Sequence, residues 1–201
     1  MIFEKLNFPL NFTFKISTLA NDFTIEDSLG NSIGYVRQKM FKLKEDVIIY
    51  DSDKKNKELV RIKADRWLDF NASYSISDAK MENKYGRLAR KGMKSIWKAH
   101  YDIIDDSEQL KFHITENNPF VRILDGLVGE IPIVGYFTGY IFNPTYSVKD
   151  KSGKEYFKLK KMPSFFGRKF RLEKISDIDS RNETLVVLSL FMMMLLERMR
   201  G

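Results

Sequence analysis

The chain has 201 residues, of which 30% are charged and 43% hydrophobic, and its formal net charge is +7 at pH 7. Such a length can bury a sizeable core, and this balance is typical of a globular domain rather than a disordered or fibrous one. The chain has no cysteine, which excludes disulfides, thiolate catalysis and cysteine metal sites and fits a reducing compartment such as the cytoplasm. We treat residues 1–201 as one domain, and the start of the sequence predicts no signal peptide.

In chain order, short segments alternate apolar and polar residues. The clearest alternations run over residues 12–16, 97–103, 110–114, 157–160 and 170–173. A period of two predicts strands with one buried and one solvated face. Further strands are expected near residues 23–27, 33–39, 47–51, 58–63, 74–78, 86–90 and 139–149.

Three of these segments repeat one pattern: aromatic, hydroxyl, β-branched, variable, Asp. They are residues 23–27, 74–78 and 146–150. Each is followed by a turn and by a strand that ends in basic residues, so we expect a repeated hairpin within one sheet. The Asp that closes each pattern is expected to hydrogen-bond the turn backbone, which is a structural role.

A short helix is predicted near residues 118–128. Asn118 suits the N-cap, Pro119 suits the first helical position, and an apolar stripe follows. Residues 131–142 are apolar and rich in glycine, and we interpret them as a buried crossing loop that enters a strand. The alternative for these residues is an element that inserts into a membrane.

The C-terminal segment is the most apolar part of the chain. From Leu185 to Leu196 only Ser189 is not apolar, so this helix must be enclosed on every side. A membrane span needs about 20 apolar residues, so length is the main obstacle to the alternative, a membrane anchor. Ser180 and Glu183 are expected to form a capping box at the helix start.

These elements predict a mostly β protein. About a dozen amphipathic strands and one helix apolar all round fit a closed antiparallel barrel that encloses the helix. A helix with its side chains is about 10–12 Å across, which demands more strands than the eight of a small, self-filled barrel. We therefore predict a barrel of about 12 strands around the C-terminal helix.

Positive charge is segregated along the chain. Residues 80–98 carry a net charge of +6 and residues 149–171 one of +7, so the remainder is negative. This pattern indicates an anionic partner, although a solvated sheet face rich in lysine is the structural alternative. Whether the two segments form one patch stays open. The candidate anion-binding residues are Arg87, Arg90, Lys91, Lys94, Lys158, Lys160, Arg168 and Lys169.

The sequence offers no catalytic signature. The phosphate-loop, dinucleotide-binding, nucleophile-elbow and zinc-protease motifs are missing. His100 and His113 lie on the polar faces of predicted strands, and with two histidines and no cysteine a metal site would depend on carboxylates. We predict no enzymatic activity, no catalytic residues, no cofactor and no metal site.

Several segments resemble the LURP-one-related proteins, part of the tubby C-terminal-like superfamily that includes the phospholipid scramblases. The similarity lies in residues 34–44, 74–105 and 146–150 and in the closing apolar helix. It implies a twelve-stranded barrel around a central helix. It also implies lipid-related function, because tubby domains bind phosphoinositides and scramblases are associated with lipid movement.

The sequence departs from scramblases in ways that affect function. It lacks their Pro-rich N-terminal region and cysteine cluster, and Arg181 and Asn182 stand where a calcium loop needs a ligand and a glycine. We therefore expect a binding module for anionic phospholipid headgroups, cytoplasmic or peripheral at a membrane surface, with no transmembrane span. The alternative is a nucleic-acid or protein adaptor, with nucleic acid the less favoured partner.

Overall fold

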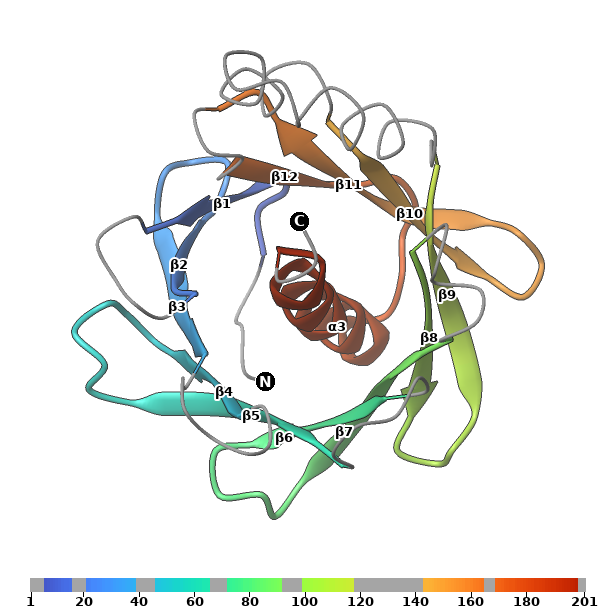
Figure 1. The fold of residues 1–201 in the computed structure, drawn as a ribbon, viewed down its shortest axis with the longest axis horizontal. Helices are drawn as coiled ribbons and strands as arrows, with labels where there is room; N and C mark the ends of the chain where they lie inside the picture. The colour runs from blue at the N-terminus through green and yellow to red at the C-terminus, as the bar shows by residue number, and fades with distance from the viewer. Residues whose placement is uncertain are drawn as a thin grey trace, which may run out of the picture.

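The computed structural model describes residues 6–15, 21–38, 46–65, 72–91, 99–117, 143–164 and 169–198. In this part of the chain, twelve antiparallel strands close into a barrel around one helix, α3 (Ser180–Arg198) (Figure 1). Each strand pairs with its neighbours in sequence, and β1 pairs with β12 to close the ring. The predicted fold class is confirmed. The helix expected near 118–128 and the loop expected at 131–142 lie outside the described residues.

Every segment predicted to be a strand overlaps one of the strands of the barrel. The strands are β1 (Leu10–Phe14), β2 (Phe23–Glu26), β3 (Ser32–Gln38), β4 (Asp46–Tyr50), β5 (Glu58–Ala64), β6 (Ser73–Asp78), β7 (Lys84–Arg90), β8 (His100–Asp105), β9 (Leu110–Glu116), β10 (Thr145–Asp150), β11 (Glu155–Met162) and β12 (Lys169–Lys174).

Alternate residues of the strands fill the barrel. In β1, Leu10, Phe12 and Phe14 are buried while Thr13 is exposed. Burying one such apolar side chain contributes about 1.5–3 kcal/mol relative to leaving it in water. The alternation read from the sequence thus becomes a continuous apolar lining that faces α3 on all sides.

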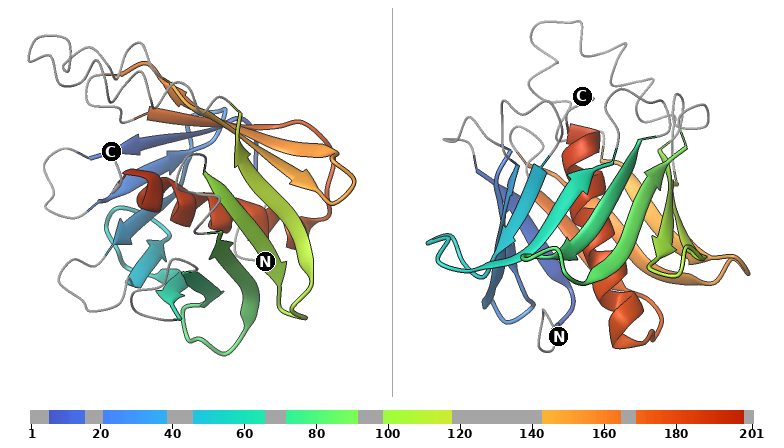
Figure 2. Two further views of the ribbon diagram at one scale, coloured as in Figure 1. Left: turned by 45° about the vertical axis from the view of Figure 1, so that its right-hand side comes forward. Right: turned by 90° about the horizontal axis from the view of Figure 1, so that it is seen from below.

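The barrel has two unlike ends. Tight turns join β2 to β3, β6 to β7, β8 to β9 and β10 to β11 at one end, which we call the turn end (Figure 2). The helix starts at the turn end, where Arg181 forms an ion pair with Asp106 of the β8–β9 turn. It then runs back through the barrel, so its last residues lie at the opposite end.

An aspartate opens four of these turns. Asp27 Oδ1 accepts backbone N–H hydrogen bonds from two and four residues further on, at 2.9 and 2.8 Å. Asp150 repeats this geometry at 2.8 and 3.0 Å, and Asp78 accepts one such bond at 2.9 Å. The structural role predicted for these three residues is confirmed. Asp105 opens a fourth turn in the same way, which the repeat pattern did not reveal.

These hydrogen bonds favour the charged carboxylate. At Asp27 and Asp105 desolvation acts to raise the pKa. Hydrogen bonds from the turn outweigh it, together with one from Asn7 at Asp27 and with the hydrogen bond and charge of Lys111 at Asp105. At Asp78 and Asp150 the largest influence is a side-chain hydrogen bond, from Asn83 and Ser152 respectively. All four carboxyls therefore have a pKa below the usual value.

The start of α3 corrects the predicted capping box of Ser180 and Glu183. The cap is Asp179, whose Oδ1 accepts the backbone N–H of Asn182 at 3.0 Å. The Glu183 carboxylate instead binds the ammonium of Lys174 at 2.7 Å. Both Ser and Asp are good N-caps. In the folded barrel the end of β12 brings Lys174 beside Glu183, and this ion pair occupies the carboxylate that the predicted box requires.

The core position expected for the C-terminal helix is confirmed. Every residue of α3 from Thr184 to Leu196 is buried. Within the described part of the chain, no helix combines the length and the apolar character needed to cross a bilayer.

The helix does not lie at equal distance from all strands, and its closest backbone neighbours are β6, β7 and β8. Gly86 of β7 allows this approach, because a Cβ there would lie 3.0 Å from Leu185 Cδ1 and 2.3 Å from the Ile104 carbonyl oxygen. On the far side, the ring of Phe12 in β1 packs against Phe191 of α3, with centroids 5.6 Å apart. The glycine on the near wall thus leaves room for the off-centre helix, and large aromatic rings fill the wider space between the helix and the far wall.

Candidate functional site

The strand order separates the two basic segments identified in the sequence. Arg87 and Arg90 belong to β7, whereas Lys158 and Lys160 belong to β11, and β8, β9 and β10 lie between these strands. Adjacent strands are about 4.8 Å apart, so the two segments are separated by roughly 19 Å along the wall. They form two surfaces rather than one patch. The candidates Lys94 and Arg168 lie outside the described residues.

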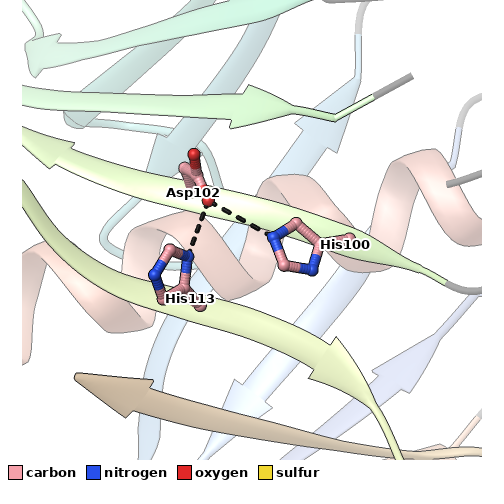
Figure 3. A group of neighbouring side chains, drawn as sticks. All are labelled: His100, Asp102 and His113. Carbon is pink, nitrogen blue, oxygen red and sulfur yellow. Dashed lines mark hydrogen bonds and ion pairs between the residues drawn. The ribbon is translucent and has the colours of Figure 1, made fainter. Parts of the chain in front are cut away.

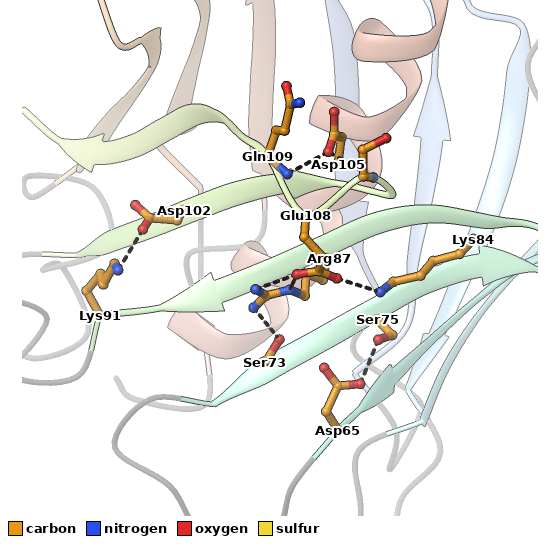
Figure 4. A network of polar contacts seen from close by, with 11 residues as sticks. Asp65, Ser73, Ser75, Lys84, Arg87, Lys91, Asp102, Asp105, Glu108 and Gln109 are labelled. Carbon is orange, nitrogen blue, oxygen red and sulfur yellow. Dashed lines mark hydrogen bonds and ion pairs between the residues drawn. The ribbon is translucent and has the colours of Figure 1, made fainter.

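Lys84 and Arg87 of β7, and Lys91 just after it, pair with acids of the neighbouring β8–β9 hairpin. Arg87 binds Glu108 at 2.8 Å, and Lys84 binds the same carboxylate at 3.0 Å (Figure 4). The hydrogen bonds from Arg87 and Lys84 hold the pKa of Glu108 below its usual value. Lys91 forms an ion pair with Asp102 at 2.9 Å. Two carboxylates thus compensate most of the charge of these three cations.

Arg90 lies on the other face of β7 from Arg87 and Lys91. It follows the buried Leu88 by two residues, so it belongs to the strand positions that face the barrel interior. Its register partner in β8 is the buried Tyr101. Its Nε atom is buried. Arg90 therefore lies on a different face from Arg87 and Lys91, although the three are close in sequence.

The second basic segment forms a continuous outer surface. Cross-strand register places Lys160 of β11 opposite Arg171 of β12, and Lys158 opposite Glu173. Lys169, two residues before Arg171, is exposed on the same side. We call Lys158, Lys160, Lys169 and Arg171 the basic face. Glu173 lies among these residues, 3.0 Å from Lys160 Nζ and 3.9 Å from Arg171 Nε.

The basic face has more positive charge that is not paired with acidic side chains than β7 has. Lys158 and Lys169 form no ion pair with any residue in the described ranges, and the side chains of Lys160 and Arg171 are 39% and 43% exposed. Arg171 was not among the sequence candidates. The signal for it was its spacing of two from Lys169, which places both on one face of a strand.

A second cluster gathers titratable side chains on the outer face of β8 and β9. His113 Nδ1 lies 2.7 Å from Asp102 Oδ1, and His100 Nε2 lies 3.5 Å from the same oxygen (Figure 3). The two imidazole rings are tilted by 41°, with centroids 5.6 Å apart. These are the only two histidines of the chain, and both meet one carboxylate.

Asp102 is an unusual member of this cluster because it is only 3% exposed. Its burial by itself would raise the pKa of its carboxyl. Hydrogen bonds from His100, Lys91 and His113, together with the charge of Lys91, outweigh that effect and hold the pKa well below its usual range. Asp102 is thus a buried, ionised carboxylate surrounded by donors.

The sequence placed His100 and His113 on polar strand faces but did not bring them together. Asp102 was overlooked because an isolated acidic residue in a strand carries no pattern of its own. The informative signal was that His100 and Asp102 are two residues apart, which places both on one face of β8. The paired strand β9 carries the other histidine, His113. Recognising it requires the register of β8 against β9, in which Asp102 faces His113.

The chain matches no protein-family model, no curated protein and no solved structure.

Proposed function

We propose that this chain is a non-enzymatic module that binds anionic phospholipid headgroups through the basic face of β11 and β12. The observation that carries the proposal is the outward projection of Lys158, Lys160, Lys169 and Arg171 from adjacent strands, with Glu173 as the acid among them. The resemblance of the sequence to the LURP-one-related and tubby-like proteins supports a lipid ligand. Binding of this kind is peripheral and reversible, and suits a cytoplasmic protein.

The expected strength follows from simple electrostatics. Each Lys or Arg close to an anionic leaflet contributes about 1 kcal/mol. Four such residues less the acid Glu173 contribute about 3 kcal/mol, which corresponds to an apparent dissociation constant on the order of 10 mM. The interaction is therefore weak, depends on salt, and needs a high lipid concentration for detection.

The neighbouring sequence strengthens this assignment. Phe165, Phe166 and Arg168 stand between β11 and β12 in the chain, although they lie outside the described residues. Aromatic residues beside cations suit the boundary between headgroups and acyl chains, where apolar burial adds to charge attraction.

The test is co-flotation with phosphatidylcholine vesicles prepared with and without phosphatidylserine, at low and at high salt. The wild-type protein should float with the anionic vesicles at low salt only. The variant Lys158→Glu, Lys160→Glu and Lys169→Glu should lose this binding, because it replaces attraction by repulsion at the basic face. The matched control reverses the exposed turn lysines Lys54, Lys57 and Lys80, with the same change of net charge, and should retain it.

Three results would contradict the proposal. Equal flotation with neutral and anionic vesicles would show that headgroup charge is not recognised. An equal loss in both charge-reversal variants would show that net charge, and not the basic face, is responsible. Binding to a single-stranded oligonucleotide without binding to anionic vesicles would favour the adaptor alternative.

A further inference from the structure

The convergence of both histidines on Asp102 depends on the packing of β8 against β9. His100 and Asp102 are two residues apart in β8 and so point to the same face of the barrel. Asp102 is the register partner of His113, and side chains of such partners have Cβ atoms about 4.5–5.5 Å apart. Three potential ligands are therefore held by two paired strands rather than by loops.

Contrary to the expectation from the sequence, we infer that His100, Asp102 and His113 form a binding site for one divalent transition-metal ion of the zinc class on the outer face of β8 and β9. One ligand atom from each residue can be chosen such that all three lie within 4.8 Å of one another. The ligand atoms are His100 Nε2, Asp102 Oδ1 and His113 Nδ1.

The distances suit coordination after a small adjustment of side chains. Tetrahedral zinc with bonds of about 2.0–2.1 Å separates its ligand atoms by about 3.3 Å. The observed separations from Asp102 Oδ1 are 2.7 Å to His113 Nδ1 and 3.5 Å to His100 Nε2, on either side of that value. Binding requires a lone pair on both His100 Nε2 and His113 Nδ1, the two atoms that face Asp102. The ring proton must therefore reside on Nδ1 in His100 and on Nε2 in His113. Both rings are partly exposed, and solvent can carry these transfers.

The surrounding charges set the limits of affinity. The Asp102 carboxylate stays ionised and is already oriented by Lys91 on its second oxygen, as metal-ligating carboxylates usually are by a neighbouring donor. Lys91 and Lys149, the register partner of His113 in β10, are cations that oppose a bound metal. We therefore expect micromolar rather than tighter binding.

The ligand set selects the class of ion. Two imidazole nitrogens and one carboxylate oxygen suit Zn²⁺, Cu²⁺ and Ni²⁺, whereas Mg²⁺ and Ca²⁺ prefer ligands that are all oxygen. Three protein ligands leave one tetrahedral position for water or an external group. Both rings are partly exposed, so solvent reaches the two histidine ligands.

The test is calorimetric titration of the full chain, without a histidine tag, with Zn²⁺ and with Mg²⁺. One equivalent of Zn²⁺ should bind and Mg²⁺ should not. The variant His100→Gln and His113→Gln should bind Zn²⁺ at least tenfold more weakly. The control Glu26→Gln removes an exposed carboxylate of β2, far from the cluster in strand order, and should bind like the wild type.

Imidazole NMR provides a readout that does not depend on any variant. The two histidines should yield two sets of ring resonances, and both sets should shift together until one equivalent of Zn²⁺ has been added. Unshifted rings, or Zn²⁺ binding that is equally strong in the folded double variant, would overturn the assignment. If the double variant does not fold, the NMR titration of the wild type decides alone.

Discussion

Replacement of Gly86 by Ala tests whether the near wall of the barrel must be free of side chains. An added Cβ would lie 2.3 Å from the Ile104 carbonyl oxygen and 3.1 Å from Asp105 Cα, both backbone atoms of β8. Backbone atoms held in a strand ladder cannot rotate away, so β7, β8 or the helix must shift. Gly86 also has a φ of 151°, which side-chain-bearing residues rarely adopt.

The two effects can be estimated separately. Overpacking of this kind costs about 1–3 kcal/mol, and a backbone conformation favoured by glycine costs about 1–3 kcal/mol for another residue. Their sum, about 2–6 kcal/mol, is a large part of the roughly 5–15 kcal/mol by which a domain is stable. For a chain of this size, the expected decrease in Tm is on the order of 10 °C.

Thermal unfolding of three variants, followed by circular dichroism, separates these contributions. Gly153→Ala carries only the backbone cost, because Gly153 has a φ of 88° and no atom lies within 4 Å of the position that its Cβ would occupy. Gly34→Ala carries only a steric cost, since its Cβ would lie 2.9 Å from the Tyr50 carbonyl oxygen. Gly86→Ala should lower Tm more than either control. A Tm equal to or above that of Gly153→Ala would refute the reasoning.

Two further predictions concern the helix and the buried carboxylate. Met193 is fully buried in α3, so Met193→Lys should abolish cooperative unfolding or lower the free energy of unfolding by more than about 4 kcal/mol. The control Met193→Leu should lower it by less than about 1.5 kcal/mol. A Tm of the Lys variant close to that of the wild type would contradict the enclosed helix. The pKa of Asp102 is lowered in the folded state, so its contribution to stability is present above the usual carboxyl pKa and is lost as pH falls below it. Asp102→Asn should therefore lower Tm at neutral pH and reduce the dependence of Tm on pH in acid, and an unchanged acid dependence would argue against this contribution.

Local patterns in the sequence were sufficient to predict the architecture of a barrel around a helix. The alternation of Phe12 and Phe14 with polar residues determines which face of β1 is buried, whatever its partners are. The run from Leu185 to Leu196 has no polar face, so it had to be surrounded. Asp27 and Asp150 act within their own turns, and such short-range chemistry can be read directly from the chain.

Features that depend on partners distant in the sequence were decided by the tertiary structure. The alternation rule predicts a solvated outer face, yet Tyr35, Ile48 and Tyr50 are buried on the outside of β3 and β4. The Tyr35 hydroxyl donates a hydrogen bond to Asp22 at 2.5 Å. The Lys15 ammonium lies over the Tyr35 ring, with Nζ 4.9 Å from the ring centroid. Such cover comes from other parts of the chain and leaves no local pattern.

The same distinction applies to the candidate sites. Composition alone located the positive charge in two segments, but only the strand order showed that three strands separate them. Arg87 and Lys91 were indistinguishable from Lys158 in the sequence, and they differ because Glu108 and Asp102 lie beside them in the barrel. His100 and His113 meet at Asp102 through the register of β8 and β9. The sequence by itself determined which residues are apolar, charged or turn-forming, because these are local properties. Only the closed barrel decided which charges are neutralised and which side chains share a site, since both depend on strand pairing.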